Sequence, residues 1–126
     1  MASLNRVQLI GRLGKEPETR TTSKGTKVCS FSLAVDRRWK GEDGVYQHET
    51  DWFNVENWGS LADYCQKHFH KGQLVFLEGR LKTDRYESQG ETRYFTKVVV
   101  RNAQSLENRS EEHAPEEVEE VQDLDV

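Results

Sequence analysis

Three short stretches of the sequence place large aromatic rings beside polar or basic side chains. In TDWFNVENWG, residues 50–59, a β-strand would put Trp52 and Trp58 on one face together with an asparagine and a glutamate, because alternate side chains share a face. The stretches RRWK and KTDRY join one further ring each, Trp39 and Tyr86, to lysine and arginine side chains. Tryptophan is costly to leave in water, so these rings predict either a covering layer of protein or a ligand with flat apolar surfaces.

The repeated pairing of a ring with a cation matches the chemistry of single-stranded nucleic acid. Bases stack on aromatic rings with little regard to their identity, while cations follow the phosphates, and each stacked base contributes about 1–3 kcal/mol. In a duplex the base faces are stacked inside, so a duplex could contact only the cations and not the rings. The pattern therefore predicts a preference for single strands. A single tryptophan on a polar face is more often covered by a loop or a subunit, but four such rings together favour a ligand.

Charge is divided unevenly along the 126 residues. Residues 1–109 hold all 18 lysines and arginines and 14 of the 22 acidic residues, which gives a net charge of +4. Residues 110–126 hold the other 8 acids and no lysine or arginine, so this end carries −8. A basic body predicts a polyanionic partner, and a block of like charge predicts a solvated tail. We expect two parts: a folded domain at residues 1–106 and a disordered acidic tail at residues 107–126.

The apolar pattern predicts the elements that carry these residues. Alternation indicates strands at residues 4–13, 28–35 and 50–58, with turn-rich connections after the first and a long glycine-tipped hairpin after the second. Helical spacing begins at Ser60, where Ser-Leu-Ala-Asp resembles a capping box, and stops at Lys71-Gly72. Two long strands follow, at residues 73–86 and 92–106, joined by the turn at 87–91.

Three strands, one helix and two strands form the order that a five-stranded OB-fold Greek-key barrel requires, with the helix between strands three and four. We therefore expect an all-β protein of this class. An open antiparallel sheet backed by one helix is the main structural alternative. Glycines at positions 11 and 79 within the strands favour closure, since they permit bends.

Residues 4 to about 104 resemble bacterial single-stranded DNA-binding proteins of the OB-fold type. The resemblance lies in NRVQLIGRLGKEPETR, SFSLAVDRRWK, TDWFNV, WGSLADYCQKHFHKG and QLVFLEGRLKTDRYESQGETRYFTKVVV, in the order and spacing of that family. It implies sequence-tolerant binding of single-stranded DNA during replication, recombination and repair, by an oligomer that is usually a homotetramer, with no catalysis.

The resemblance also implies residue roles. Base stacking is expected at Trp39, Trp52, Trp58 and Tyr86. Phosphate contacts are implied at Lys40, Lys71, Lys82, Arg85 and Arg93, and charge and placement add Arg6, Arg37 and Arg38. Position 58 is Trp and position 86 is Tyr, where the best-known members of the family carry Phe and Trp. Both changes keep a stacking ring.

The last residues depart more from the family pattern. Family members typically end in aspartates closed by a tip resembling Ile-Pro-Phe, which docks into basic pockets of replication and repair proteins. This chain ends in VQDLDV, without proline or a terminal aromatic residue. The residues that could still dock with a protein partner are Asp123, Leu124, Asp125 and Val126. Alternatively, the tail could compete with DNA for the basic groove.

Other functions have weaker support in the sequence. Cys65 and His68 could face together on a helix, but His70 would point elsewhere, so a zinc site is not expected. No hydrolase motif or phosphate-binding glycine loop occurs, and we expect no catalytic residue, cofactor or metal. A protein-interaction module with its tryptophans buried between subunits, and an RNA-binding OB protein, remain as alternatives.

The sequence shows no signal peptide or membrane-spanning run, and its two cysteines do not form a disulfide-rich framework. We expect a cytoplasmic, nucleoid-associated protein that keeps Cys29 and Cys65 as thiols.

Overall fold

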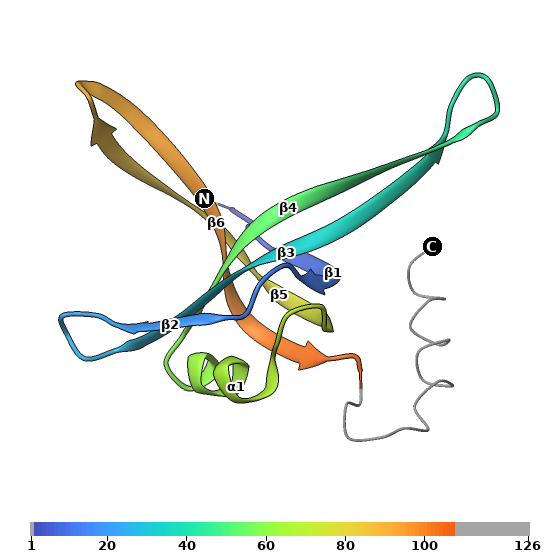
Figure 1. Ribbon diagram of the computed structural model, residues 1–126. Coiled ribbons are helices and arrows are strands. Elements are labelled where there is room, and N and C mark those ends of the chain that lie inside the picture. Colours follow the sequence, from blue (N-terminus) through green and yellow to red (C-terminus); the bar gives the residue numbers. More distant parts are fainter. Residues whose placement is uncertain (1, 108–126) are drawn as a thin grey trace.

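The computed structural model describes residues 2–107 of the chain. Within them lie six strands and one helix: β1 (Val7–Leu13), β2 (Glu18–Thr21), β3 (Lys27–Lys40), β4 (Tyr46–Trp58), α1 (Ser60–His68), β5 (Leu74–Ser88) and β6 (Glu91–Ser105). The strands are ordered β1-β5-β6-β4-β3-β2, and β1 also pairs with β3. Long hairpins extend from a central barrel, and α1 lies at one end of it (Figure 1).

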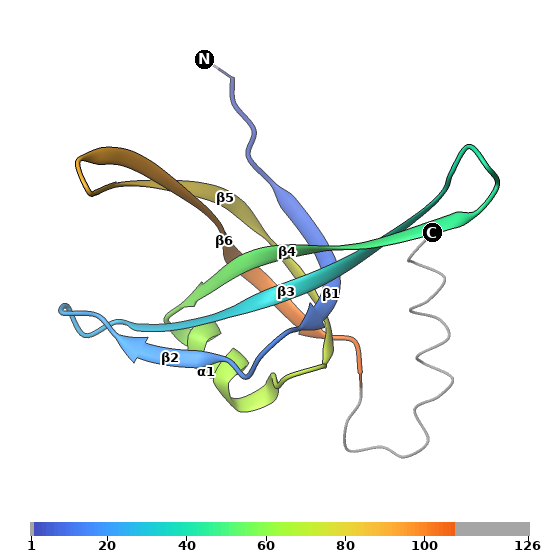
Figure 2. The ribbon, with the colours of Figure 1, turned by 45° about the horizontal axis from the view of Figure 1, so that its top comes forward.

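The barrel is closed by two contacts between strands that are distant in sequence. β1 meets β3 through Leu13, which pairs with Leu33, and β4 runs parallel to β6, with Val55 opposite Val98. The turned view in Figure 2 shows β1 lying between β3 and β5. Closure with one helix between the third and fourth barrel strands confirms the predicted OB-fold topology and excludes the open sheet.

Two glycines let the backbones approach at the corners of the barrel. A β-carbon at Gly11 would collide with the carbonyl oxygen of Ala34, where β1 crosses to β3. One at Gly79 would collide with the carbonyl of Val99, beside the bulge in β5. Both glycines therefore lie where closure brings two backbones together, and only the second lies at a bulge.

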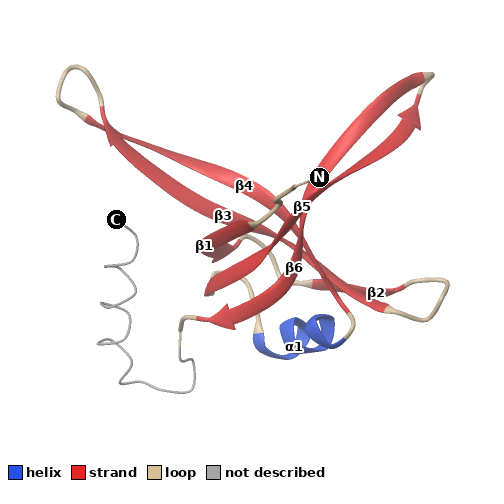
Figure 3. Cartoon of the chain, turned by 180° about the vertical axis from the view of Figure 1, so that it is seen from behind, coloured by secondary structure: helices blue, strands red, loops and turns tan. Residues whose placement is uncertain are grey.

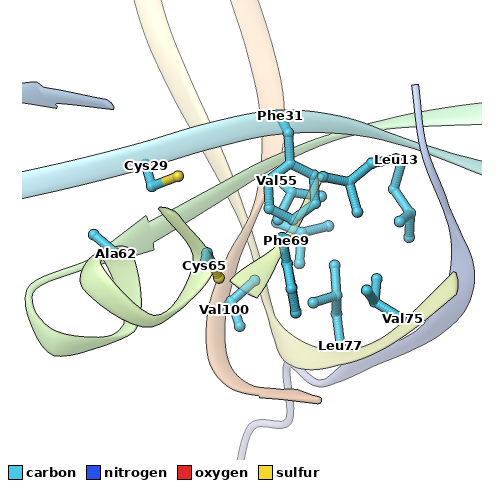
Figure 4. Close-up of a cluster of buried hydrophobic side chains, with 12 residues drawn as sticks. Leu13, Cys29, Phe31, Val55, Ala62, Cys65, Phe69, Val75, Leu77 and Val100 are labelled. Atoms are coloured by element: carbon cyan, nitrogen blue, oxygen red, sulfur yellow. The ribbon is translucent and has the colours of Figure 1, made fainter. Parts of the chain in front are cut away.

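The core fills the barrel and continues beneath α1. It includes Leu13, Val55 and Leu77, all at most 2% exposed, and Ala62 and Cys65 from the helix (Figure 4). Just beyond the helix, Phe69 packs its ring edge-on against Phe31, with 6.0 Å between the centroids. The helical spacing in the sequence thus marks the face that seals the barrel.

The segment after β1 forms a strand where turns alone were expected. β1 pairs with β3 only through Arg12 and Leu13, so the first half of β3 needs another partner, and β2 supplies it between Glu18 and Thr21. A four-residue edge strand with two threonines is too short to show clear alternation. The turn interpretation was therefore wrong for these residues.

The start of α1 also differs from the prediction. Gly59, with φ of 64°, precedes the helix, and no side chain caps it, so Ser60 is the first helical residue and not the cap. Asp63 instead pairs with Lys27 at 2.7 Å, which ties the helix to β3. Figure 3 shows the helix against the strands from behind.

Cys29 and Cys65 are buried free thiols. Burial raises the pKa of Cys65 to about 12, and the neighbouring Cys29 adds to the shift. His68 stacks against Tyr64 with 4.8 Å between the ring centroids. Within residues 2–107, no group of three or more His, Cys, Asp or Glu side chains could hold a metal ion.

Candidate nucleic-acid interface

The outer face of β4 carries two exposed tryptophans. Trp52 is 60% exposed and Trp58 is 41% exposed, whereas Val55 points into the core. Trp52 lies over Gly14, where a β-carbon would collide with its ring. Along the described part of the chain, no layer of protein hides these two rings, so a flat ligand could stack on their exposed sides.

A buried carboxylate holds the Trp58 ring. The indole Nε1 of Trp58 donates a hydrogen bond of 2.9 Å to Glu56 Oε1. The other carboxylate oxygen of Glu56 accepts from Lys97 Nζ at 3.0 Å and from Arg20 at 3.4 Å. Because the Glu56 side chain is only 8% exposed, these partners offset the cost of burying its charge.

Lys97 extends this cluster to the neighbouring hairpin. Its ammonium group also lies 2.9 Å from Asp84, and Asp84 lies 3.3 Å from Lys82. Burial alone would lower the pKa of Lys97, but its bonds to Asp84 and Glu56 outweigh this effect and raise it. Arg20, Glu56, Lys97 and Asp84 therefore join four strands on one outer face, and we call these four residues the charged cluster.

The β5–β6 hairpin adds further rings to the same face. Directly paired residues of antiparallel strands share a face, and Tyr86 pairs with Arg93, Asp84 with Phe95, and Lys82 with Lys97. Tyr86 is 47% exposed and Phe95 is 43% exposed. Since Lys97 reaches Glu56 on β4, the face that carries these residues is continuous with the face of the two tryptophans.

The other face of this hairpin also carries exposed groups. Arg85 pairs with Tyr94, which is 66% exposed. The structure thus places the predicted residues Arg85 and Tyr86 on opposite faces. Tyr94 and Phe95 were not singled out from the sequence. The sequence signal for them was the pair of adjacent aromatic residues in TRYFT, on the strand that returns past Tyr86. Adjacent residues of a strand point to opposite faces, so a strand with one buried face can bury at most one of the two.

The β3–β4 hairpin carries Trp39, which is 42% exposed. The guanidinium of Arg37 lies 5.1 Å from the centre of the Trp39 ring, and it also pairs with Glu49 at 2.7 Å and with Asp51 at 2.8 Å. These bonds raise the pKa of Arg37, the hydrogen bond to Asp51 most of all. Arg37 therefore has carboxylate partners already and orients the ring.

The remaining predicted cations are all exposed but lie in different places. Lys40 and Arg38 alternate with Trp39 and so point to the other face of the hairpin. Lys71 follows α1, and its backbone N–H donates to Glu16. Arg6 precedes β1 and pairs with Glu78 at 3.4 Å. The proposed docking residues Asp123, Leu124, Asp125 and Val126 lie outside the described residues.

A hollow of about 290 Å³ opens on the face of the tryptophans. It lies over the part of β4 between Trp52 and Trp58, and the side chains around it include Glu18, Ser30, Asn54, Glu56, Phe95 and Lys97. The lining also includes Lys15 and Glu16, so it combines the exposed ring of Phe95 with hydrogen-bonding groups and with charges of both signs.

A closed OB barrel whose outer face carries exposed rings among cations defines the class of oligonucleotide-binding barrels. Residues 4–106 match the sequence model of the Single-strand binding protein family, and the chain belongs to that family.

Similar proteins agree with this assignment. Single-stranded DNA-binding protein 1 of Chlorobaculum tepidum is 40% identical over 105 residues, which are 82% of this chain and 65% of that protein. Single-stranded DNA-binding protein 2 of Streptococcus agalactiae is 40% identical over 107 residues, 85% of this chain and 80% of that protein. The chain thus spans from about two thirds to four fifths of the length of these relatives.

Two solved structures are also similar. The Plasmodium falciparum SSB complex with ssDNA superposes with a TM-score of 0.79 at 28% identity, covering 85% of this chain and 98% of that one. A deletion mutant of the single-stranded DNA-binding protein from Thermus aquaticus gives a TM-score of 0.75 at 32% identity, covering 85% of this chain and 52% of that one. No helix among residues 2–107 has the length and apolar character that a membrane span needs.

Proposed function

We propose that this protein binds single-stranded DNA with little regard to sequence, and that it protects and organises exposed strands during replication, recombination and repair. The observation that carries the proposal is the exposure of Trp52 and Trp58, 60% and 41%, on one outer face of the barrel. Family membership and the names of the similar proteins support DNA as the ligand in place of RNA.

The proposed mechanism divides the work between rings and cations. Bases stack on Trp39, Trp52, Trp58 and Tyr86, while phosphates follow the exposed lysines and arginines, with no chemical change in the DNA. Binding releases counterions, so the logarithm of the binding constant falls with the logarithm of salt concentration by about 0.7 for each phosphate neutralised.

We further propose that the barrel acts as a homo-oligomer, by analogy with the tetramers of its family, in the cytoplasm on the nucleoid. The free edge of β1 supports self-association. Among the described residues, Val7 to Gly11 pair with β5 on one side and have no strand on the other. Native mass spectrometry of the full chain would test the number of subunits, and a monomer at micromolar concentration would contradict this part of the proposal.

The test of DNA binding is a fluorescence titration with oligo-dT and, separately, with a duplex of equal length. We expect strong quenching of tryptophan emission by the single strand, and we expect it to persist when salt is added. Absence of quenching by either ligand, with blue-shifted emission in the free protein, would favour the interaction-module alternative, in which the rings are buried between subunits.

Two variants separate stacking from charge. Trp52→Ala should weaken binding more than Lys82→Ala at high salt, because salt screens the cation and leaves stacking in place. Dissociation constants measured across a salt series would show this difference. Equal losses for both variants at every salt concentration would contradict the division of labour.

A further inference from the structure

β4 carries another exposed ring on the face of its two tryptophans. Tyr46 is the first residue of β4 and is 68% exposed. Six residues separate Tyr46 from Trp52, and six more separate Trp52 from Trp58. Residues an even number of positions apart on a strand share a face, and six residues of extended chain span roughly 20 Å. This face of β4 therefore presents three rings at equal intervals.

Contacts between β3 and β4 show that the face continues from Trp52 to Tyr46. The pairing register of the two strands is unbroken over this stretch, and Figure 2 shows them running side by side to the tip of the hairpin. Between the two rings, the Thr50 hydroxyl donates to Asp36 at 2.8 Å, and His48 Nε2 lies 3.8 Å from the same carboxylate. These contacts join side chains of one face, so the alternation of faces holds along the hairpin.

Two free cations of the hairpin lie on the same face as Tyr46. Lys40 pairs directly with Tyr46 across the two strands, and Arg38 pairs with His48 in the next row of this face. The ion pairs that the described residues form on this hairpin involve neither Lys40 nor Arg38. Both cations can therefore bind a phosphate without giving up a carboxylate partner.

The opposite face of the hairpin, which carries Trp39, is less suited to phosphates. Its cation is Arg37, which is held by Glu49 at 2.7 Å and by Asp51 at 2.8 Å. One arginine against two carboxylates leaves excess negative charge on that face. The hairpin therefore attracts a polyanion on the Tyr46 face and not on the Trp39 face.

Three carboxylates lie near the Tyr46 face and do not cancel its charge. Asp36 is the acid of the face itself, on the side toward the barrel. Glu42 and Asp43 lie in the turn beyond Lys40, and the Asp43 carboxylate accepts from a backbone N–H of the turn at 3.0 Å. A phosphate that passes along this face from Tyr46 toward the barrel therefore meets two free cations and one carboxylate.

We propose that Tyr46 is a stacking site for a base of bound single-stranded DNA, and that Arg38 and Lys40 contact the phosphates that lead from it toward Trp52. The base stacks on the exposed phenol ring with little regard to its identity. Trp39 points to the other face, so the two cations serve Tyr46 and not Trp39. This inference rests on the proposed function and extends its ligand surface to the tip of the hairpin.

The test measures binding of an oligo-dT that is long enough to span the three rings of β4. Quenching of tryptophan emission gives dissociation constants at low and high salt for the wild type, Tyr46→Ala, Tyr46→Phe and Val45→Ala. The readout stays intact because every variant keeps all three tryptophans. Val45 is the matched control, since it is the neighbouring residue of the turn and is 56% exposed. Both side chains lie outside the barrel, so the fold does not depend on them.

We expect Tyr46→Ala to raise the dissociation constant about fivefold or more at both salt concentrations, the lower end of the range for one stacked base. Tyr46→Phe keeps the ring and should bind as the wild type does, and so should Val45→Ala. Arg38→Gln should reduce the slope of the logarithm of the binding constant against the logarithm of salt concentration by about 0.7, the value for one phosphate. Tyr46→Ala should leave that slope unchanged.

The outcomes distinguish this proposal from the proposed function. If the wild type binds oligo-dT and Tyr46→Ala binds it equally well, the stacking site is refuted while DNA binding stands. An equal loss in Tyr46→Phe would assign the effect to the hydroxyl group, and an equal loss in Val45→Ala would assign it to the shape of the turn; either result refutes stacking. A smaller number of subunits for Tyr46→Ala in native mass spectrometry would place the ring in a subunit contact and would also refute it. If the wild type does not bind oligo-dT, the proposed function itself fails.

Discussion

Removal of Lys97 tests whether the charged cluster is a buried interaction or a screened surface pair. In Lys97→Met, the carboxylate of Glu56 loses its partner at 3.0 Å and keeps only Trp58 and the longer contact to Arg20. Breaking one side of a buried pair costs about 3–5 kcal/mol. Arg20 and Asp84 have side chains 59% and 39% exposed, so water offsets part of the loss, and we expect about 2–3 kcal/mol.

The assay is urea unfolding followed by circular dichroism, which does not depend on the tryptophans. At a slope of about 1–3 kcal/mol per molar urea, the midpoint should fall by roughly 1 M. Protein concentration must be the same for every variant, because subunit association would add to the stability. Emission of Trp58 should shift as well, since the acceptor of its N–H is no longer fixed.

A second variant separates pairing from packing. The double substitution Lys97→Met with Glu56→Leu removes both charges, and it should recover stability to within about 1 kcal/mol of the wild type, because apolar groups of similar size can replace a buried pair. A surface substitution usually changes the free energy of unfolding by less than about 0.5 kcal/mol. A loss that small in Lys97→Met alone would refute the interpretation of Lys97 and Glu56 as a buried ion pair.

Three further predictions follow from the described contacts. The hydrogen bond from Lys97, together with the nearby ammonium group of Lys82, lowers the pKa of Asp84 from its ordinary value of 3.8. The Asp84 carboxylate therefore stabilises the fold above that pH, and this stabilisation is lost as pH falls through the lower folded pKa. The stability difference between wild type and Asp84→Asn should therefore be present at pH 5 and vanish in acid; a constant difference down to the lowest pH would contradict the pairing. Gly79→Ala should lower the free energy of unfolding, measured in urea, by about 1–3 kcal/mol, because its β-carbon meets the Val99 carbonyl. Arg80→Ala, at an exposed position, should change that free energy by about 0.5 kcal/mol or less. Similar values for the two variants would refute the claim that Gly79 is needed for the close approach of the strands. Cys65, with its pKa raised to about 12 by burial, should resist a thiol reagent at pH 8 in the native protein and react in urea, and fast reaction of the native thiol would show that α1 opens.

Periodicity in the sequence identified the barrel because closure needs apolar residues at every second position of long strands. Leu33, Val55 and Leu77 all occupy such positions and all are buried. The same rule could not detect β2, whose four residues are held by the free edge of β3 and not by a pattern of their own. The capping prediction failed because Gly59, with a positive φ, sets where the helix begins.

The prediction that Trp52 and Trp58 are exposed on one face of a strand was confirmed. Their roles in binding stay predictions. The charged cluster that holds Trp58 could not be predicted from the sequence. Its four residues come from four strands, and the registers of these strands appear only in the fold. Phe95 was missed for a related reason. Its place beside β4 depends on the parallel contact between β4 and β6, which local sequence does not encode.

The position of a ring on a long hairpin or on the barrel affects how much motion the ring loses when a base binds. In β3, burial ends near Val35, and the strand continues with five exposed residues to Lys40. Trp39 and Tyr86 lie on such outer segments, which have few apolar contacts, while Trp58 ends β4 directly after three buried residues of the barrel. Regions with few buried contacts open at low free energy. Rings on the hairpins must therefore give up more motion when a base stacks on them, so the same stacking contact yields less net affinity there than on the barrel.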